Sequence, residues 1–157
     1  MHAQSWSGGC SCSKLRYTLK FEPMVVHCCH CTQCQRMTGS GFVINGVIET
    51  SNVEIKTGSL KAFNLPSETG RKLIVYRCAE CGTDIHTDYG GRETMIFVRM
   101  TTLDDPTRFG PDVHIFTRSK LPWISLPPQV PAYEAFYPTF EEVWTSEALQ
   151  RRRALGF

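Results

Sequence analysis

Eight cysteines in three groups are the residues of this 157-residue chain most able to do chemistry. The groups are Cys10-x-Cys12, then Cys28-Cys29-His30-Cys31-x-x-Cys34, then Cys78-x-x-Cys81-Gly82. Zinc takes four tetrahedral ligands in a structural site, and three protein ligands with one open position in a catalytic site. Eight cysteines can therefore provide one site of each kind and leave one cysteine over.

Spacing alone leaves two pairings of these groups open. One pairing joins Cys31-x-x-Cys34 to Cys78-x-x-Cys81 and gives a zinc ribbon with a long insertion. The other joins Cys10-x-Cys12 to Cys78-x-x-Cys81 and leaves three thiolates close together in the sequence, Cys29, Cys31 and Cys34. In either pairing, Gly82 can take the positive φ that turns the chain away from a metal ion.

The sequence predicts a reducing, cytoplasmic compartment, and in such a compartment clustered cysteines bind metal more often than they form disulfides. No run approaches the ~20 apolar residues that span a bilayer, and the first residues have neither a basic nor an apolar signal region. We therefore expect a soluble, cytoplasmic protein with no membrane partner. Thiols stay reduced in the cytoplasm, where clustered cysteines more often bind metal than pair with one another.

Composition narrows the class of protein further. Hydrophobic residues make up 41% of the chain, which excludes general disorder. The formal net charge is +2, and the run Arg151–Arg153 is typical of a solvated terminus, so no nucleic-acid partner is expected. No linker or repeat divides the sequence. We expect a single zinc-binding domain over residues 1–157.

Period-two alternation of apolar and polar residues dominates the chain and predicts strands. It is clearest where Leu15, Tyr17, Leu19 and Phe21 alternate with Lys14, Arg16, Thr18 and Lys20. Further strands are predicted at 24–27, 42–48, 53–57, 60–65, 73–77, 94–100 and 113–116. Turn signals between them, at 57–58, 66–70, 90–91 and 105–106, indicate hairpins, and the fold expected is mainly β, built from antiparallel sheets.

Helical structure is expected in only two short places. One begins after Cys31 and ends near Gly39. The other follows Pro138, where Thr139 and Glu142 have capping-box spacing. Between residue 120 or so and this tail, four prolines predict an extended segment that wraps the sheet.

Several residues near the cysteine groups have a structural interpretation. Cys28, the leftover cysteine, is predicted to face the core from a strand. We expect His30 to lie outside the ligand set, in an exposed or supporting position, because cysteines crowd it on both sides. The remaining structural residues are His27, His86 and His114 in strands, Asp104 and Asp105 in a turn before Pro106, and Trp123 as a core plug.

The motifs, taken in order, resemble the glutathione-dependent formaldehyde-activating enzyme family, which includes centromere protein V-like proteins. The resemblance covers residues 5–125 or so. The residues that carry it are Gly9-Cys10-Ser11-Cys12 with Arg16-Tyr17, Cys29-His30-Cys31-Thr32-Gln33-Cys34, Cys78-Ala79-Glu80-Cys81-Gly82-Thr83, Thr102-Leu103-Asp104-Asp105-Pro106, and His114-Ile115-Phe116 with Pro122-Trp123.

The resemblance implies a β-tent fold of antiparallel sheets pinned by a structural zinc, and it assigns the cysteines. It implies that the structural zinc ligands are Cys10, Cys12, Cys78 and Cys81, and that a second, weaker, catalytic zinc is held by Cys29, Cys31 and Cys34. The chain departs from the family pattern at Gln35, where many members have Arg, at Ser13 and at Arg77. Of these, Gln35 bears on substrate recognition.

Three thiolates offset the charge of a zinc ion, which makes it a weak Lewis acid but a good partner for a fourth, soft ligand. A substrate thiol in that position would lose its proton and attack an aldehyde carbon. We therefore predict a carbon–sulfur lyase that forms or cleaves an S-hydroxymethyl adduct, with glutathione as the expected thiol and a small aldehyde as its partner. Arg36 is the predicted donor to a glutathione carboxylate. Two alternatives stay open: a non-enzymatic zinc-stabilised binding module, and a thiol or zinc redox sensor.

Overall fold

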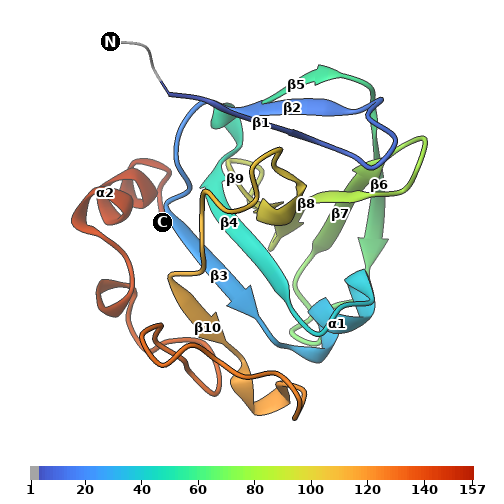
Figure 1. Cartoon of the computed structure of the whole chain (residues 1–157). Helices are drawn as coiled ribbons and strands as arrows, with labels where there is room; N and C mark the ends of the chain where they lie inside the picture. The colour runs from blue at the N-terminus through green and yellow to red at the C-terminus, as the bar shows by residue number, and fades with distance from the viewer. Residues whose placement is uncertain (1–3) are drawn as a thin grey trace. The chain divides into compact units, whose positions relative to one another are not determined.

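The protein is described here by a computed structural model that covers residues 4–157 (Figure 1). Ten strands and two α-helices form within these residues, so the prediction of a mainly β fold is confirmed. The strands are β1 (Trp6–Gly9), β2 (Arg16–Leu19), β3 (Val25–Cys29), β4 (Val43–Glu49), β5 (Val53–Thr57), β6 (Leu60–Leu65), β7 (Leu73–Cys78), β8 (Asp84–Tyr89), β9 (Met95–Arg99) and β10 (Val113–Ile115). The helices are α1 (Thr32–Thr38) and α2 (Ser146–Ala154).

The chain forms two compact units, each assembled from two separate stretches of sequence. The first unit contains residues 4–23 and 47–108, and the second contains residues 24–46 and 109–157. Strand β4 runs from the second unit into the first. The arrangement of the whole chain as a single domain stays a prediction.

One sheet of the first unit has the strand order β1-β2-β5, and both pairs are antiparallel. The predicted alternation buries Leu15, Tyr17 and Leu19, each with at most 1% of its surface exposed, while Phe21 lies outside β2 and is exposed. Gly8 has to be glycine because a Cβ there would come within 2.5 Å of the Tyr17 ring. Close packing of β1 on Tyr17 thus fixes the strand that leads into Cys10.

The antiparallel strands β6, β7, β8 and β9 form the other part of the first unit. The turns at residues 66–70 and 90–91 connect hairpins, as predicted. The turn at Thr57-Gly58 does not, because β5 pairs with β2 while β6 pairs with β7. Gly58 takes φ +78, and a Cβ there would come within 2.6 Å of the Lys14 carbonyl oxygen, so the turn between the two sheets requires a glycine at this position.

In the second unit, β3 and β10 pair in parallel, which corrects the expectation of antiparallel sheets for this pair. More than 80 residues separate the two strands, so no hairpin dictates their direction. The predicted extended segment lies beside β10, where the His114 N–H donates to the Pro131 carbonyl at 2.8 Å and the Tyr133 N–H donates to the His114 carbonyl at 2.9 Å.

Two details of the C-terminal region differ from prediction. Helix α2 begins at Ser146, and its N-cap is Thr145, whose Oγ1 accepts from the Ala148 N–H at 3.1 Å. Thr139 instead precedes a single 3₁₀ turn, η4 (Phe140–Glu142). Trp123 is 76% exposed and is therefore no core plug, whereas Tyr137 and Trp144 fill the core of this unit and are hydrogen-bonded at 2.6 Å.

Neither helix in residues 4–157 is both long enough and apolar enough to cross a membrane.

Candidate metal centres

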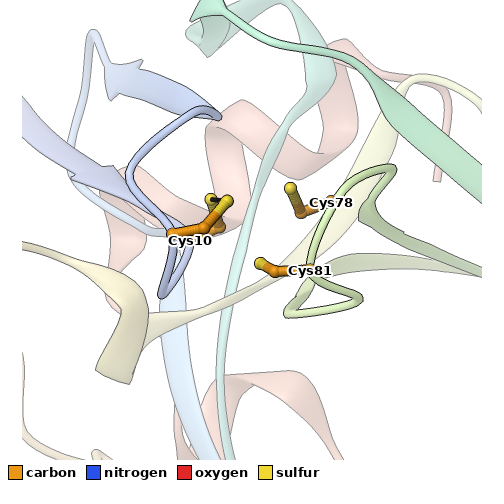
Figure 2. Close-up of side chains that lie close together, drawn as sticks. Cys10, Cys78 and Cys81 are labelled. Carbon is orange, nitrogen blue, oxygen red and sulfur yellow. Dashed lines mark hydrogen bonds between the residues drawn. The ribbon is translucent and has the colours of Figure 1, made fainter.

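The first cluster of cysteines lies in the first unit, where two turns face each other (Figure 2). Cys10 and Cys12 follow β1, Cys78 ends β7, and Cys81 lies in the turn that leads to β8. The four sulfur atoms all lie within 4.8 Å of one another, and the Sγ atoms of Cys10 and Cys12 are 3.4 Å apart. The structure therefore brings Cys10 and Cys12 together with Cys78 and Cys81. This is the second of the two pairings that spacing left open.

Backbone geometry shapes both turns so that the sulfurs converge. Ser13 and Gly82 take positive φ values of 61° and 76°, which reverse the chain directly after the second cysteine of each pair. The Leu15 N–H donates to Cys10 Sγ at 3.3 Å, and the Gly82 N–H donates to the Cys78 carbonyl at 2.9 Å. Backbone donors that hold the sulfurs in place are typical of the surroundings of a metal site.

Thr83 connects the two turns. Its Oγ1 accepts from the Ser11 N–H at 3.1 Å and lies 3.1 Å from Cys81 Sγ. Its hydroxyl and backbone N–H lower the pKa of Cys81 to about 5, so this exposed sulfur is a thiolate at neutral pH. The backbone N–H of Lys14 favours the thiolate of Cys12 too, but Cys10 beside it raises the pKa of Cys12 to about 11. The four sulfurs could all ionise only with a cation among them, and four tetrahedral thiolates are a donor set for structural zinc.

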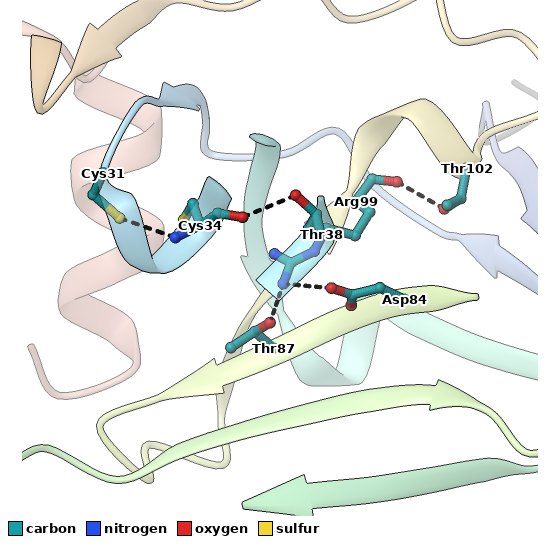
Figure 3. Close-up of polar contacts among 7 residues, drawn as sticks. All are labelled: Cys31, Cys34, Thr38, Asp84, Thr87, Arg99 and Thr102. Atoms are coloured by element: carbon teal, nitrogen blue, oxygen red, sulfur yellow. Dashed lines mark hydrogen bonds and ion pairs between the residues drawn. The ribbon is translucent and has the colours of Figure 1, made fainter. Parts of the chain in front are cut away.

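The second cluster lies in the second unit within six residues of sequence. Cys29 ends β3, Cys31 is the N-cap of α1, and Cys34 lies in the first turn of that helix. Their three sulfur atoms also lie within 4.8 Å of one another. The Cys34 N–H donates to Cys31 Sγ at 3.3 Å, and the Thr38 hydroxyl donates to the Cys34 carbonyl at 2.8 Å, as Figure 3 shows. Helix α1 ends as predicted, with Gly39 at φ +67.

The electrostatics of this cluster are dominated by its own sulfurs. Cys29 and Cys34 lower the pKa of Cys31 to about 3, because both stabilise its thiolate, and the Cys34 and Gln33 N–H groups add to this. Cys31 and Cys34, together with burial, raise the pKa of Cys29 far above its ordinary value. Cys29 and Cys34 are buried while Cys31 is half-buried, so the cluster has one accessible side. Three sulfurs with one accessible side fit a metal ion that keeps an open ligand position.

Gln35 and Arg36 follow Cys34 on α1 and have different surroundings. Both hydrogens of the Gln35 amide are used within the protein, since Nε2 donates to the His30 and Ser119 carbonyls at 2.9 Å each. This residue therefore holds the segment that bears the cysteines against Ser119 and has no amide hydrogen left for a substrate. Arg36 lies exposed in the last turn of the helix and makes no ion pair within residues 4–157, so its guanidinium is free to bind an anion.

Sequence reasoning missed a third group of donor atoms, formed by Cys28, His30 and His114 in the second unit. Cys28 is buried, as predicted, but His30 is fully buried and not exposed. The i, i+2 spacing of Cys28, on β3, and His30, directly after it, could have indicated that both share a face.

Three other residues expected to be structural, His27, His86 and Asp105, have partners within the protein. His27 Nε2 lies 3.0 Å from the Tyr137 hydroxyl, and His86 stacks on Tyr76 with ring centroids 4.5 Å apart. The Asp105 carboxylate accepts from the Thr107 N–H at 3.1 Å, as a turn residue does. None of these residues belongs to a cluster of metal-ligating side chains in the described chain.

The chain combines a mainly β fold with one four-cysteine cluster and one three-cysteine cluster. It therefore falls in the class of β proteins that have two candidate zinc centres. The chain belongs to the glutathione-dependent formaldehyde-activating enzyme family, whose profile matches residues 5–119.

Two curated relatives carry names that propose the same activity. One, from Emericella nidulans, is 27% identical over 77 residues, which is 49% of this chain and 38% of the relative. The other, from Talaromyces marneffei, is 32% identical over 75 residues, which is 46% of this chain and 38% of the relative. The matched part thus spans well under half of these relatives. A crystal structure of a Rhodobacter sphaeroides protein aligns with 81% of this chain and 99% of its own at 16% identity and a TM-score of 0.48.

Proposed function

We propose that this protein is a zinc-dependent carbon–sulfur lyase that forms or cleaves the S-hydroxymethyl adduct of glutathione and formaldehyde. Family membership supports the choice of thiol and aldehyde. The observation that carries the proposal is the convergence of the Cys29, Cys31 and Cys34 sulfurs at the start of α1, buried on one side and accessible on the other. A centre of this form offers a thiol one position at the metal.

The donor set fits zinc. The neighbouring sulfurs raise the pKa of Cys29, so all three thiols can ionise together only when a positive ion lies among them. A zinc ion held there would supply a fourth ligand position and lower the pKa of a thiol placed in it.

The reaction combines one thiol with one aldehyde. The glutathione sulfur gives up its proton and forms a bond to the formaldehyde carbon, while the carbonyl π pair moves to oxygen and that oxygen takes up a proton. The reverse reaction breaks the carbon–sulfur bond. Cys31, the half-buried member of the cluster, lies on the side from which a substrate can approach.

Two neighbouring side chains assist in different ways. Gln35 fixes the segment between Cys29 and Cys31 by binding the His30 carbonyl, so the sulfurs keep their spacing when a thiol binds. Arg36 would receive a glutathione carboxylate in a charge-assisted hydrogen bond. Gln35 would therefore affect the binding of the metal, and Arg36 the binding of glutathione.

Cys10, Cys12, Cys78 and Cys81 would hold the second, structural zinc. Four thiolates complete a tetrahedral shell and leave no position for a substrate. All eight cysteines are free thiols in the structure, which suits the reducing environment of the cytoplasm, where we expect the protein to act.

Exchange NMR at equilibrium tests the proposed reaction, because it separates catalysed from spontaneous exchange between free and S-hydroxymethyl glutathione. We expect the zinc-loaded protein to accelerate this exchange and the Cys31→Ser protein to leave it at the spontaneous rate. The four-cysteine zinc and the melting temperature of the variant serve as its folding control. Full acceleration by a folded Cys31→Ser protein would refute the mechanism, and no acceleration by the zinc-loaded wild type would refute the function.

A further inference from the structure

We propose that Cys28, His30 and His114 form a third metal site, distinct from the two cysteine clusters and suited to a soft, singly charged ion such as copper(I). The site lies in the second unit, where β3 meets β10. It draws on one thiol and two imidazoles, which are soft or borderline ligands.

Strand pairing explains how residues distant in the sequence meet at this point. In the parallel register of β3 and β10, Cys28 lies directly opposite His114, so the two side chains share a face of the pair. His30 is two residues further along, where its N–H still donates to the Ile115 carbonyl at 3.0 Å, and it points to the same face as Cys28. Cys29, between them, points to the opposite face, where it joins the three-cysteine cluster.

The donor atoms are close enough to share one ion. His30 Nε2 lies 3.0 Å from His114 Nδ1 and 3.5 Å from Cys28 Sγ, and all three atoms lie within 4.8 Å of one another. Donors that bind one ion at about 2.0 to 2.3 Å are separated from each other by roughly 3.3 to 3.8 Å. The sulfur distance fits as it stands, and the two rings need to separate by only a few tenths of an ångström.

Hydrogen bonding accounts for only part of this geometry. His30 Nε2 carries either one N–H or one lone pair, so it can make one good hydrogen bond, yet it has two polar neighbours. An ion among the three atoms would take one lone pair from each of them. The ring protons would then lie on His30 Nδ1 and His114 Nε2, two buried atoms that have no hydrogen-bond partner in the described chain.

The burial of the three ligands favours an ion with a single positive charge. The exposed fractions of Cys28, His30 and His114 are 2%, 0% and 5%, so the site is closed to water. A divalent ion with one thiolate and two neutral imidazoles would leave a net charge of +1 in the interior, which is costly. A singly charged ion with the same ligands leaves no net charge, and thiolate ligands select copper(I).

The test is anaerobic titration of the zinc-loaded protein with copper(I) buffered by bicinchoninate, followed by X-ray absorption at the copper edge. We expect one copper(I) per chain to bind while zinc is retained, with one sulfur and two nitrogen neighbours. His114→Gln should weaken this binding by about 100-fold or more, since loss of a mere supporting residue at a metal site already costs up to about 100-fold. His27→Gln changes a buried histidine on β3, next to Cys28 in sequence and outside the cluster; it is the matched control and should bind as the wild type does.

Three results would overturn the proposal. They are copper uptake only in exchange for zinc with sulfur-only neighbours, undiminished binding by His114→Gln, and uptake of a third zinc in preference to copper(I). The absorption spectrum of the wild type decides between them even where a variant fails to fold. Because neither proposed zinc site is involved, failure of the copper site leaves the proposed reaction untouched.

Discussion

The two cysteine clusters differ in how much of the chain each one joins. The four-cysteine cluster connects turns that are more than 60 residues apart, and its pairs come from the ends of different strands. The three-cysteine cluster lies within six residues, where a strand end and a helix N-cap already hold the sulfurs. A metal ion in the first would close a long loop, whereas one in the second would close almost none. Stability should therefore depend on the first cluster and reactivity on the second.

Substitution of Cys81 by Ser should have the largest effect. In small zinc peptides the metal supplies on the order of 10 to 16 kcal/mol, which is as large as the whole stability of a typical domain. We expect the Cys81→Ser protein to lose one zinc and its cooperative thermal transition, measured by circular dichroism. A melting curve that matches the wild type would show that this cluster does not hold the fold together.

Cys31→Ser, the same chemical change in the other cluster, should have the opposite profile. We expect loss of the second zinc and of catalysed exchange, with the thermal transition nearly unchanged because serine can still cap α1 and Gln35 still binds the His30 carbonyl. Zinc analysis and calorimetry of the two variants side by side provide the comparison. If both variants melt alike, the division of roles between the clusters fails.

Acidification should empty the three-cysteine cluster before the other. Protons compete with zinc for thiolates, and a ligand with a raised pKa binds its proton at higher pH. Each cluster has one cysteine with a lowered pKa, Cys31 at about 3 and Cys81 at about 5, so the ligand with the highest pKa decides which cluster takes up a proton first. That ligand is Cys29 in the three-cysteine cluster, whose pKa is raised far above its ordinary value, and Cys12 in the other cluster, whose pKa reaches about 11. As the pH falls, a chromophoric chelator should record two steps of zinc release, the first of which is missing in Cys31→Ser. Release in the reverse order would contradict this account.

Gln35→Leu should weaken zinc binding at the three-cysteine cluster by about 10- to 100-fold, the effect typical of residues that support metal ligands. The physical reason is the loss of two hydrogen bonds that hold the His30 and Ser119 carbonyls. Competition with a chelator measures the affinity. Gln35→Glu should be worse still, because a carboxylate would face those two carbonyl oxygens. Unchanged affinity in both variants would mean that Gln35 does not position the cluster.

Arg36→Gln should have the smallest effect and should leave the metal alone. Loss of a charge-assisted hydrogen bond to glutathione should raise its KM by about 10-fold, with kcat and zinc affinity unchanged. Steady-state measurements over a range of glutathione concentrations separate these quantities. A KM equal to that of the wild type would remove Arg36 from the substrate site.

Strands β2 and β7 could be predicted because buried residues alternate with partly exposed ones along them. Strands β3 and β10 are buried throughout and were predicted from their runs of apolar residues. Strand β8 (Asp84–Tyr89) was not among the predicted strand ranges, although His86 was placed in a strand, because its sequence is polar while its middle residues are buried. Asp84 there forms an ion pair with the buried Arg99 at 3.0 Å, and Arg99 also donates to Thr87 (Figure 3). Strand β1 (Trp6–Gly9) was missed because two of its four residues are glycines, which pack closely where side chains would not fit.

The candidate sites, like the strands, could be predicted only in part. The sulfurs close in sequence could be grouped from spacing, but the partner of Cys10 and Cys12 depended on the family resemblance, because no local rule fixes which turns meet. The group of Cys28, His30 and His114 was missed because it requires the register of a parallel pair, and parallel strands distant in sequence carry no local signal. From the sequence, Gln35 was associated with substrate recognition. Its hydrogen bonds to the His30 and Ser119 carbonyls could not be predicted, because only the folded chain brings Ser119 near it.

The most direct test of the central claim is the zinc content per chain, followed by cobalt substitution and titration with glutathione. Two zinc ions are expected, and glutathione should change the cobalt spectrum of the wild type but not that of Cys31→Ser. A single zinc ion, with a cobalt spectrum that glutathione leaves unaltered, would contradict the claim that the three-cysteine cluster is an open metal centre for a thiol.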